Sequence, residues 1–292
     1  MENGDCLMGR FSNLKCLYDK WIAEINADSY MSQLTIEYKK WLTLLQNSYP
    51  YLLEDKYSNP TYIYVPQNWK TAKNKIMIVG KEGYGEWGYG KKYGWVEKSN
   101  AWNPDDFADI QLYNRDLLFS QTVYYHNDYM DEKYTDFNTW FTNLYKQRDP
   151  FHYAFWKRFL RIYQLSPQNT SITWTNSDKI FALKNSKNGS ALSVRDRKNL
   201  HSLNYSILAE EIKITQPTVV VFFGVYWNII NIDLNNIYKL TCNKEQSAKW
   251  KAEKICVAED EKRIYVFSQH PAFKTKLYED KVIDIIKDYV KK

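Results

Sequence analysis

The sequence predicts an α/β protein with three layers, in which helices cover both faces of a central, mainly parallel sheet of four strands. Two observations support this prediction. Short apolar runs alternate along the chain with longer segments of helical periodicity, which is typical of βαβ units. One of these runs, residues 219–224, is apolar without a break, as expected for a strand that is buried on both faces.

The first predicted elements precede the sheet. Apolar residues at helical spacing predict two helices between about residues 13 and 48, and a segment rich in Tyr, Pro and Asn follows up to residue 73. We therefore expect residues 1–73 to form a helical N-terminal extension that packs on the core, and residues 74–292 to form the α/β domain.

The strands and helices of this domain follow from the pattern of apolar residues. Each predicted strand is a short apolar run that ends at a loop, and each predicted helix has one broad apolar face. In chain order we expect a strand at 75–79, helices at 113–126, 135–146 and 151–164, a strand at 171–175, a helix at 200–215, strands at 219–224 and 263–267, and a helix at 277–290.

The composition excludes several classes of protein. Of the 292 residues, 44% are apolar and 17% are aromatic, which is ample for a sizeable core. The chain has no run of about 18 uncharged apolar residues, and its start lacks the basic and apolar blocks of a signal peptide. We therefore expect a cytoplasmic protein without a membrane span, a monomer for which nothing indicates an obligatory protein partner.

The charged residues and cysteines narrow the choice of ligands. The 40 Lys and Arg residues exceed the 34 Asp and Glu residues, and the resulting charge of +6 is scattered, which allows a polyanionic partner without requiring one. Cys6, Cys16, Cys242 and Cys256 lack the tight CxxC spacing of zinc and iron–sulfur sites. We therefore expect reduced thiols, no metal and no cofactor.

Two loops that follow predicted strands carry residues suited to catalysis. The first, at 80–86, reads Gly-Lys-Glu-Gly-Tyr-Gly-Glu, and the second, at 268–271, reads Ser-Gln-His-Pro. In open α/β sheets the ligand lies beyond the carboxyl ends of the strands, so Glu82 and His270 are expected to face one pocket. Asn176, at the end of the second strand, and Tyr226, after the third, are expected at the same edge.

The segment from Gly83 to Trp95 combines five glycines with five aromatic residues. Glycine allows close approach of the backbone to a ligand, and aromatic side chains such as Tyr84 and Trp87 offer flat faces for stacking. The segment is therefore a candidate for a loop that covers a ligand. The alternative is a cluster of surface turns whose aromatic side chains pack onto the core.

The order of these motifs resembles the uracil-DNA glycosylase superfamily. The motifs that carry the resemblance are Gly80-Lys81-Glu82-Gly83-Tyr84, a strand that ends in Trp174-Thr175-Asn176, a strand that ends in Phe222-Phe223-Gly224, and a strand that is followed by His270-Pro271. The resemblance spans roughly residues 75 to 275 and implies a uracil-DNA glycosylase-like domain. It also implies a monofunctional DNA glycosylase, which flips out a pyrimidine and hydrolyses its N-glycosidic bond to leave an abasic site.

The resemblance also implies the roles of individual residues. Glu82 would activate water, Tyr84 would line the 5-position of the pyrimidine, Asn176 would read the base edge and His270 would stabilise the departing base. The residues implied to bind the substrate are Gly80, Lys81, Tyr84, Trp87, Asn176 and Tyr226.

The motifs depart from the family pattern at several positions. Glu82 replaces Asp, Gly83 replaces Pro, Lys81 replaces Gln and Ala272 replaces Ser, while the wedging leucine has no clear counterpart in residues 273–277. These departures leave room for a base larger than uracil. A modified cytosine, such as the hydroxymethylated or glucosylated bases of phage DNA, would make the chain an anti-phage defence protein.

The chemistry of the reaction agrees with these residue types. Cleavage of an N-glycosidic bond produces an oxocarbenium-like sugar and an anionic base, so it needs a carboxylate near the sugar and a donor near the base. Glu82 and His270 meet these needs, although a helix cap and a structural turn are the alternatives for them. Asn176 offers a donor and an acceptor to a pyrimidine edge, and its alternative is a helix N-cap, for which Asp178 competes.

Contacts with the DNA backbone are expected from a few basic residues and one aromatic residue, which are Lys184, Lys187, Arg195, Phe273 and Lys274. For Lys184, Lys187 and Arg195, the alternative is an ordinary solvated loop. Two other functions stay open, a catalytically silent binder of DNA or nucleotides with the same fold, and an unrelated nucleotide-binding protein. The glycine-rich loop lacks the GxGxxG and Gly-Lys-Ser/Thr motifs of such a nucleotide-binding protein.

Overall fold

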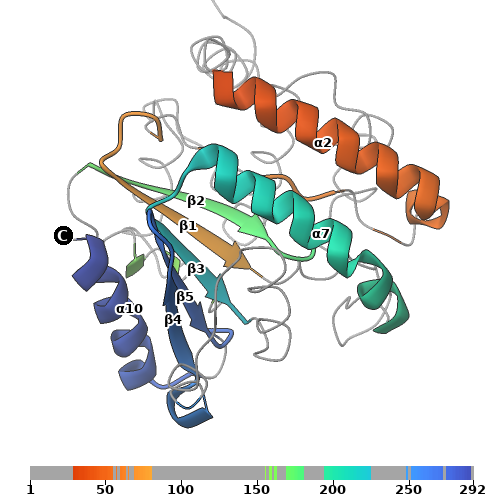
Figure 1. Ribbon diagram of the computed structural model, residues 1–292. Coiled ribbons are helices and arrows are strands. Elements are labelled where there is room, and N and C mark those ends of the chain that lie inside the picture. Colours follow the sequence, from red (N-terminus) through yellow and green to blue (C-terminus); the bar gives the residue numbers. More distant parts are fainter. Residues whose placement is uncertain are drawn as a thin grey trace, which may run out of the picture.

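The fold is seen in a computed structural model that describes residues 29–54, 57, 60–63, 65, 69–80, 155, 158–159, 161–162, 169–180, 194–224, 248, 251–271 and 274–290. Within these residues a five-stranded sheet packs among the helices α2, α7 and α10 (Figure 1). The protein is therefore of the α/β class, with a mostly parallel sheet.

The sheet has the strand order β2-β1-β3-β5-β4. Four strands are parallel to one another: β1 (Asn74–Gly80), β2 (Thr170–Asn176), β3 (Val219–Phe223) and β5 (Ile264–Ser268). All five residues of β3, the central strand, are buried, as its uninterrupted apolar run predicts. The four predicted strands are therefore confirmed, each with bounds that agree within one residue.

The predicted number of strands was wrong, because β4 (Ile255–Glu259) pairs with β5 in the antiparallel direction at the edge of the sheet. β4 is five residues long, and its apolar run of Ile255 to Ala258 is short and lies between the charged residues Lys254 and Glu259. A tight turn at Asp260 joins it to β5, and the Asp260 carboxylate accepts hydrogen bonds of 2.8 and 2.9 Å from the backbone N–H groups of Lys262 and Arg263. This aspartate between two apolar runs is the signal that indicates a hairpin.

The helices predicted at 200–215 and 277–290 are present, although the first of them begins six residues earlier than predicted, at Val194. The described helices are α2 (Ser29–Ser48), the short 3-10 helix η1 (Pro50–Leu53), α7 (Val194–Thr215) and α10 (Lys276–Val290). Residues 155, 158–159 and 161–162 are also helical, as expected for the segment 151–164. The helices predicted at 113–126 and 135–146, and the first part of the predicted N-terminal extension, lie outside the described residues.

Helices cover both faces of the sheet. Successive strand residues point to opposite faces, and Thr175 of β2 bonds to Glu211 of α7, which places α7 on one face. The strand register puts Thr175 in line with Phe267 of β5, so the next residue, Ser268, points to the other face. There Ser268 bonds to Arg158, which pairs with Glu279 of α10. Figure 1 shows α2 lying on the outer side of α7.

No helix among the described residues is long and apolar enough to span a bilayer.

Candidate functional site

The carboxyl ends of the four parallel strands meet at one edge of the sheet. Gly80, the last residue of β1, pairs with Asn176, the last residue of β2, and Phe223 at the end of β3 pairs with Ser268 of β5. The chain passes from β1 to β2 on one side and from β3 towards β5 on the other. The ends of β1 and β3 therefore flank a switch point, which is where open α/β sheets bind their ligands.

Asn176 is buried at this edge against the backbone of Gly80. A Cβ atom on Gly80 would lie 2.4 Å from the Asn176 Oδ1 atom and 3.2 Å from the ring of Phe155, so only glycine fits here. The Asn176 side chain is 3% exposed, and its Nδ2 group has no hydrogen-bond acceptor among the described residues. Because a buried, unsatisfied donor costs about 1–3 kcal/mol, this amide is suited to bind an acceptor atom of a ligand.

His270 packs in the same way against the end of the neighbouring strand. Gly224, the residue after β3, has a φ of +82°, and a Cβ atom there would lie 3.0 Å from the His270 Cβ atom and 3.4 Å from its Cδ2 atom. Both the positive φ and the close approach of the histidine favour glycine. The His270 side chain itself is exposed, so the imidazole is accessible at the edge that also holds Asn176.

No protein family, curated protein or solved structure matches this chain.

A buried network anchors the loop that follows Asn176. The Lys179 Nζ atom lies 2.6 and 2.7 Å from the two carboxylate oxygens of Glu211, and both side chains are fully buried. Thr175 donates a hydrogen bond of 2.9 Å to the same carboxylate, and the hydroxyl of Tyr38 donates to it from α2. Burial lowers the pKa of Lys179 below its ordinary value, while the charge of Glu211 acts in the opposite direction. Side chains of α2 and α7 therefore hold the end of β2 and the loop that follows it.

The backbone of the same loop is also bonded on both sides. The N–H group of Ser177 donates to the carbonyl oxygen of Gly80 at 2.8 Å, which extends the β1–β2 ladder beyond the strands. The N–H group of Thr61 donates to the carbonyl oxygen of Lys179 at 2.7 Å. Asn176 thus begins a loop whose next three residues are fixed by hydrogen bonds or burial.

A second buried cation lies behind the loop that carries His270. The Arg158 side chain is almost fully buried and donates hydrogen bonds to both carboxylate oxygens of Glu279 in α10. Its Nη1 atom donates to the hydroxyl of Ser268 at 3.1 Å and to the carbonyl oxygen of Gln269 at 2.9 Å. The residue before His270 is therefore bonded directly to a buried guanidinium group.

The structure brings together only part of the predicted site. Gly80, Asn176 and His270 lie at the carboxyl edge of the sheet. Arg195 is exposed in the first turn of α7, and Lys274 is half-buried just before α10. Figure 1 shows that α7, whose first turn contains Arg195, begins on the side of the strand arrowheads.

The other predicted site residues lie outside the described residues, and their roles stay predictions. They are Lys81, Glu82, Tyr84, Trp87, Lys184, Lys187, Tyr226 and Phe273. The loop from Gly83 to Trp95 and its proposed covering role belong to the same group.

Two residues near the site were missed by the sequence reasoning. Phe155 packs edge-on against Phe223, with ring centroids 5.4 Å apart, and its ring also lies against Gly80. Arg158 follows Phe155 by three residues and was read only as part of a helix with an apolar face. A cation on the apolar face of a predicted helix is the signal that indicates such a buried role.

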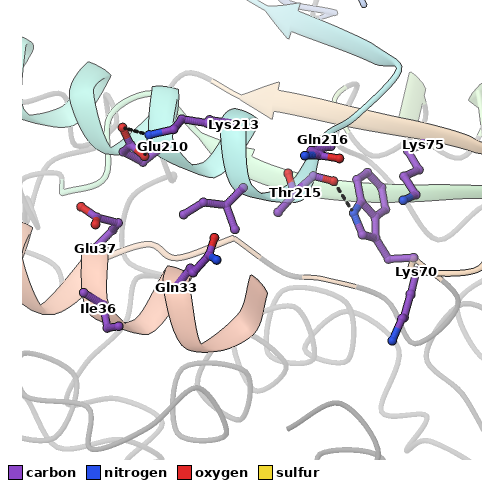
Figure 2. Close-up of a pocket in the computed structure, with 11 residues that line it drawn as sticks. Gln33, Ile36, Glu37, Lys70, Lys75, Glu210, Lys213, Thr215 and Gln216 are labelled. Atoms are coloured by element: carbon purple, nitrogen blue, oxygen red, sulfur yellow. Dashed lines mark hydrogen bonds and ion pairs between the residues drawn. The ribbon is translucent and has the colours of Figure 1, made fainter. Parts of the chain in front are cut away.

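The cavity in Figure 2 lies at the opposite end of the sheet from this site. It has a volume of about 650 Å³ and is lined by the start of β1, the end of α7 and one face of α2. Lys213 pairs with Glu210 at 2.9 Å, and the indole of Trp69 donates to the carbonyl oxygen of Thr215 at 2.9 Å. The lining is mixed in charge and contains none of the predicted site residues.

Replacing Gly80 by alanine is expected to destabilise the protein by about 1–3 kcal/mol, the usual cost of overpacking a filled site. The new Cβ atom would overlap the Asn176 Oδ1 atom and force the amide to move. Urea denaturation of Gly80→Ala, Asn176→Ala and the double variant tests this contact. The double variant should lose less stability than the sum of the two single changes. Additive losses would mean that Asn176 does not rest on Gly80.

Proposed function

We propose that this chain is a monofunctional DNA glycosylase, which flips a pyrimidine nucleotide out of the helix and hydrolyses its N-glycosidic bond. The observation that carries the proposal is the buried amide of Asn176, whose Nδ2 donor is unpaired among the described residues, at the sheet edge that also holds His270. The parallel strands with helices on both faces support a three-layer domain like that of the uracil-DNA glycosylase superfamily.

The arrangement of the strand ends suits recognition of a base and its sugar. Asn176 ends β2 and His270 follows β5, and three strand spacings of ~4.8 Å put these two strand ends roughly 14 Å apart. Side chains that reach inward from both positions can contact one flipped nucleotide. The segment that carries Glu82 follows β1, which lies between them, so Glu82 is a candidate for a carboxylate that faces this space.

In the proposed reaction a water molecule attacks the C1′ atom of the sugar as the bond from C1′ to the base nitrogen breaks. Glu82 accepts a proton from the water and stabilises the positive charge that develops on the sugar. The electron pair of the broken bond leaves with the base, and His270 donates a hydrogen bond to the resulting anion. The products are the free base, after it gains a proton, and an abasic site, so the chemistry requires neither metal nor cofactor.

The side chains around the base set the class of substrate. The Nδ2 group of Asn176 donates a hydrogen bond, so the base must present an acceptor atom at its edge, as the pyrimidines do. Extrusion from the helix costs a few kcal/mol and is easiest at damaged or mispaired sites. Tyr84 and Trp87 are the residues predicted to determine whether the site accepts uracil or a hypermodified phage base such as glucosylated hydroxymethylcytosine. An enzyme that excises the phage base would act in anti-phage defence.

A panel of modified DNAs tests the proposed function. Duplexes and single strands with uracil, a thymine mismatch, hydroxymethylcytosine or glucosylated hydroxymethylcytosine are incubated with the protein, and abasic sites are then cleaved with alkali. We expect excision of at least one base, with a rate at least 10-fold lower for Asn176→Asp, which has nearly the same shape but lacks the N–H donor. Binding without excision of any base would instead support a catalytically silent member of the fold.

The affinity for DNA is expected to fall steeply with salt, because phosphate contacts release counterions. Arg195→Ala and Lys274→Ala should each reduce the slope of log K against log salt by about 0.9 if each residue contacts one phosphate. Lys213→Ala is the matched control, because Lys213 is exposed near the opposite end of the sheet. Fluorescence anisotropy between about 50 and 300 mM salt, a range that includes physiological ionic strength, measures these slopes. Equal slopes in all variants would remove Arg195 and Lys274 from the DNA interface.

A further inference from the structure

Arg158 is a buried charge that the proposed reaction does not use. Its side chain is 2% exposed, and four hydrogen bonds link its guanidinium group to Glu279, Ser268 and Gln269. Glu279 is partly buried, with 17% of its side chain exposed. Taking the buried guanidinium group out of water costs several kcal/mol, and apolar residues of similar volume often stabilise a core equally well. The pair therefore calls for an explanation other than stability.

The contacts of this pair converge on the residue before His270. The carbonyl oxygen of Gln269 accepts a hydrogen bond from Arg158, and the N–H group of Gln269 donates to the hydroxyl of Tyr278 at 2.9 Å. Tyr278 donates in turn to the carbonyl oxygen of Lys254 at 2.8 Å. Both polar groups of the Gln269 backbone are thus held by side chains, so the peptide that leads into His270 has little freedom to rotate.

The guanidinium group also packs against two aromatic rings near the strand ends. Its Cζ atom lies 4.7 Å from the ring centroid of Phe223 and 5.7 Å from that of Tyr278. Phe223 packs against Phe155, which lies against Gly80. One buried cation therefore contacts the loop of His270 and the aromatic side chains beneath the strand ends.

We propose that the Arg158–Glu279 pair is a positioning device for His270, an inference that rests on the proposed function. By holding the carbonyl group of Gln269, Arg158 keeps the His270 side chain against Gly224, with its imidazole at the edge where Asn176 lies. A catalytic group that is misplaced by about 1 Å can lose on the order of 10²-fold in rate. Arg158 acts through His270 and does not itself contact the base.

The chain offers a matched control for this pair. Arg161 and Asp280 form an ion pair between the same helical segment and α10, but their side chains are 34% and 36% exposed. Among the described residues, this second pair makes no hydrogen bond to β5 or to residues 269–271. Removing the Arg161–Asp280 pair therefore removes an ion pair between the helical segment and α10, but it leaves the hydrogen bonds of Gln269 in place.

The experiment compares Arg158→Met/Glu279→Leu with Arg161→Met/Asp280→Leu in the full chain. Both charges are removed together, because one buried charge without its partner is strongly destabilising. We expect kcat for base excision to fall at least 10-fold in the first variant, with KM and DNA affinity within about threefold of wild type. The control variant should keep all three within about twofold. Equal kcat values in wild type and the first variant, or equal losses in both variants, would overturn the proposal.

A second measurement does not depend on catalysis. Hydrogen exchange of the Gln269 and His270 amides should be at least 10-fold faster in Arg158→Met/Glu279→Leu than in wild type, and unchanged in the control. If wild type excises no base, the proposed function fails, and unchanged exchange would then separately overturn the positioning role. Arg158→Lys replaces the double variant if the latter does not fold, since lysine keeps the charge but cannot bond to Glu279 and Gln269 in the same geometry.

Discussion

Replacing His270 by alanine, or Glu82 by glutamine, is expected to lower the rate of base excision by a factor on the order of 10² or more. In the proposed reaction the first change would remove the donor that stabilises the departing base, and the second would remove the carboxylate that activates water. His270→Ala should fold normally, because the His270 side chain is exposed and deleting it creates no internal cavity. Single-turnover assays on the best substrate of the DNA panel measure both rates.

His201→Ala is the matched control for the histidine. His201 lies in α7, where it is half-buried and its ring packs against that of Tyr205 with centroids 4.5 Å apart. This variant should excise at a rate within about twofold of wild type, because the proposed reaction does not use His201. Wild-type rates in both His270→Ala and Glu82→Gln would show that the chemistry does not take place beside these two residues.

Replacing Glu211 by glutamine is expected to destabilise the protein by about 3–5 kcal/mol, because it leaves the Lys179 ammonium buried without a counter-charge. A loss of this size is a large part of the stability of a typical domain. Urea denaturation at neutral pH measures it. Glu210→Gln is the control, since Glu210 pairs with the exposed Lys213 and its loss should cost only about 0–1 kcal/mol.

The stability of Glu211→Gln should also depend on pH in a defined direction. In the wild-type protein, burial lowers the pKa of Lys179 below its ordinary value of 10.5. Removing the Glu211 carboxylate lowers this pKa further. Between this lowered pKa and 10.5 the unfolded chain binds the extra proton, so the free energy of unfolding rises with pH. The variant should therefore regain part of its stability as the pH rises towards 10.5. A loss equal at all pH values would show that Lys179 is not the source of the effect.

The double variant Lys179→Met/Glu211→Leu separates charge from packing. Without either charge the core no longer holds an isolated ion, so the double variant should be more stable than Glu211→Gln. It should remain somewhat below wild type, because the hydroxyls of Tyr38 and Thr175 lose their common acceptor.

The sequence was sufficient to predict the parallel strands and the edge of the sheet at which the candidate site lies. The run of Val219 to Phe223 is apolar throughout because this strand is covered on both faces, and that pattern is visible without a structure. The places of Asn176 and His270 followed from a general rule on where parallel strands end. β4 was missed because its apolar run has only four residues, Ile255 to Ala258, and periodicity alone does not identify so short a run as a strand.

The periodicity of α10 shows a second limit of the sequence. The sequence predicts one broad apolar face for this helix, and its buried residues are Val282, Ile283, Ile286 and Val290. Ile285 and Tyr289 lie at the border of the core and are only partly buried. The width of the apolar face leaves open which of its residues are buried, and contacts with β3 and β5 decide this.

The two buried ion pairs could not be predicted from the sequence, because each depends on distant parts of the chain. Arg158 and Glu279 are separated by 121 positions, and Lys179 and Glu211 by 32. Local pattern identifies each of these residues as a charge on a helix or a loop, which is usually solvated. Their burial arises only when the helices close over the sheet and bring the partners together.

The central claim is that this chain hydrolyses an N-glycosidic bond in DNA, and the most direct test is to identify both products of one reaction. Wild-type protein is incubated with the best substrate of the panel, the released material is identified by mass spectrometry, and abasic sites are counted on the same DNA. We expect one intact pyrimidine base to be released for each abasic site, with the DNA strand unbroken until alkali is added. DNA that is bound by the protein but releases no base, from any member of the panel, would contradict the central claim.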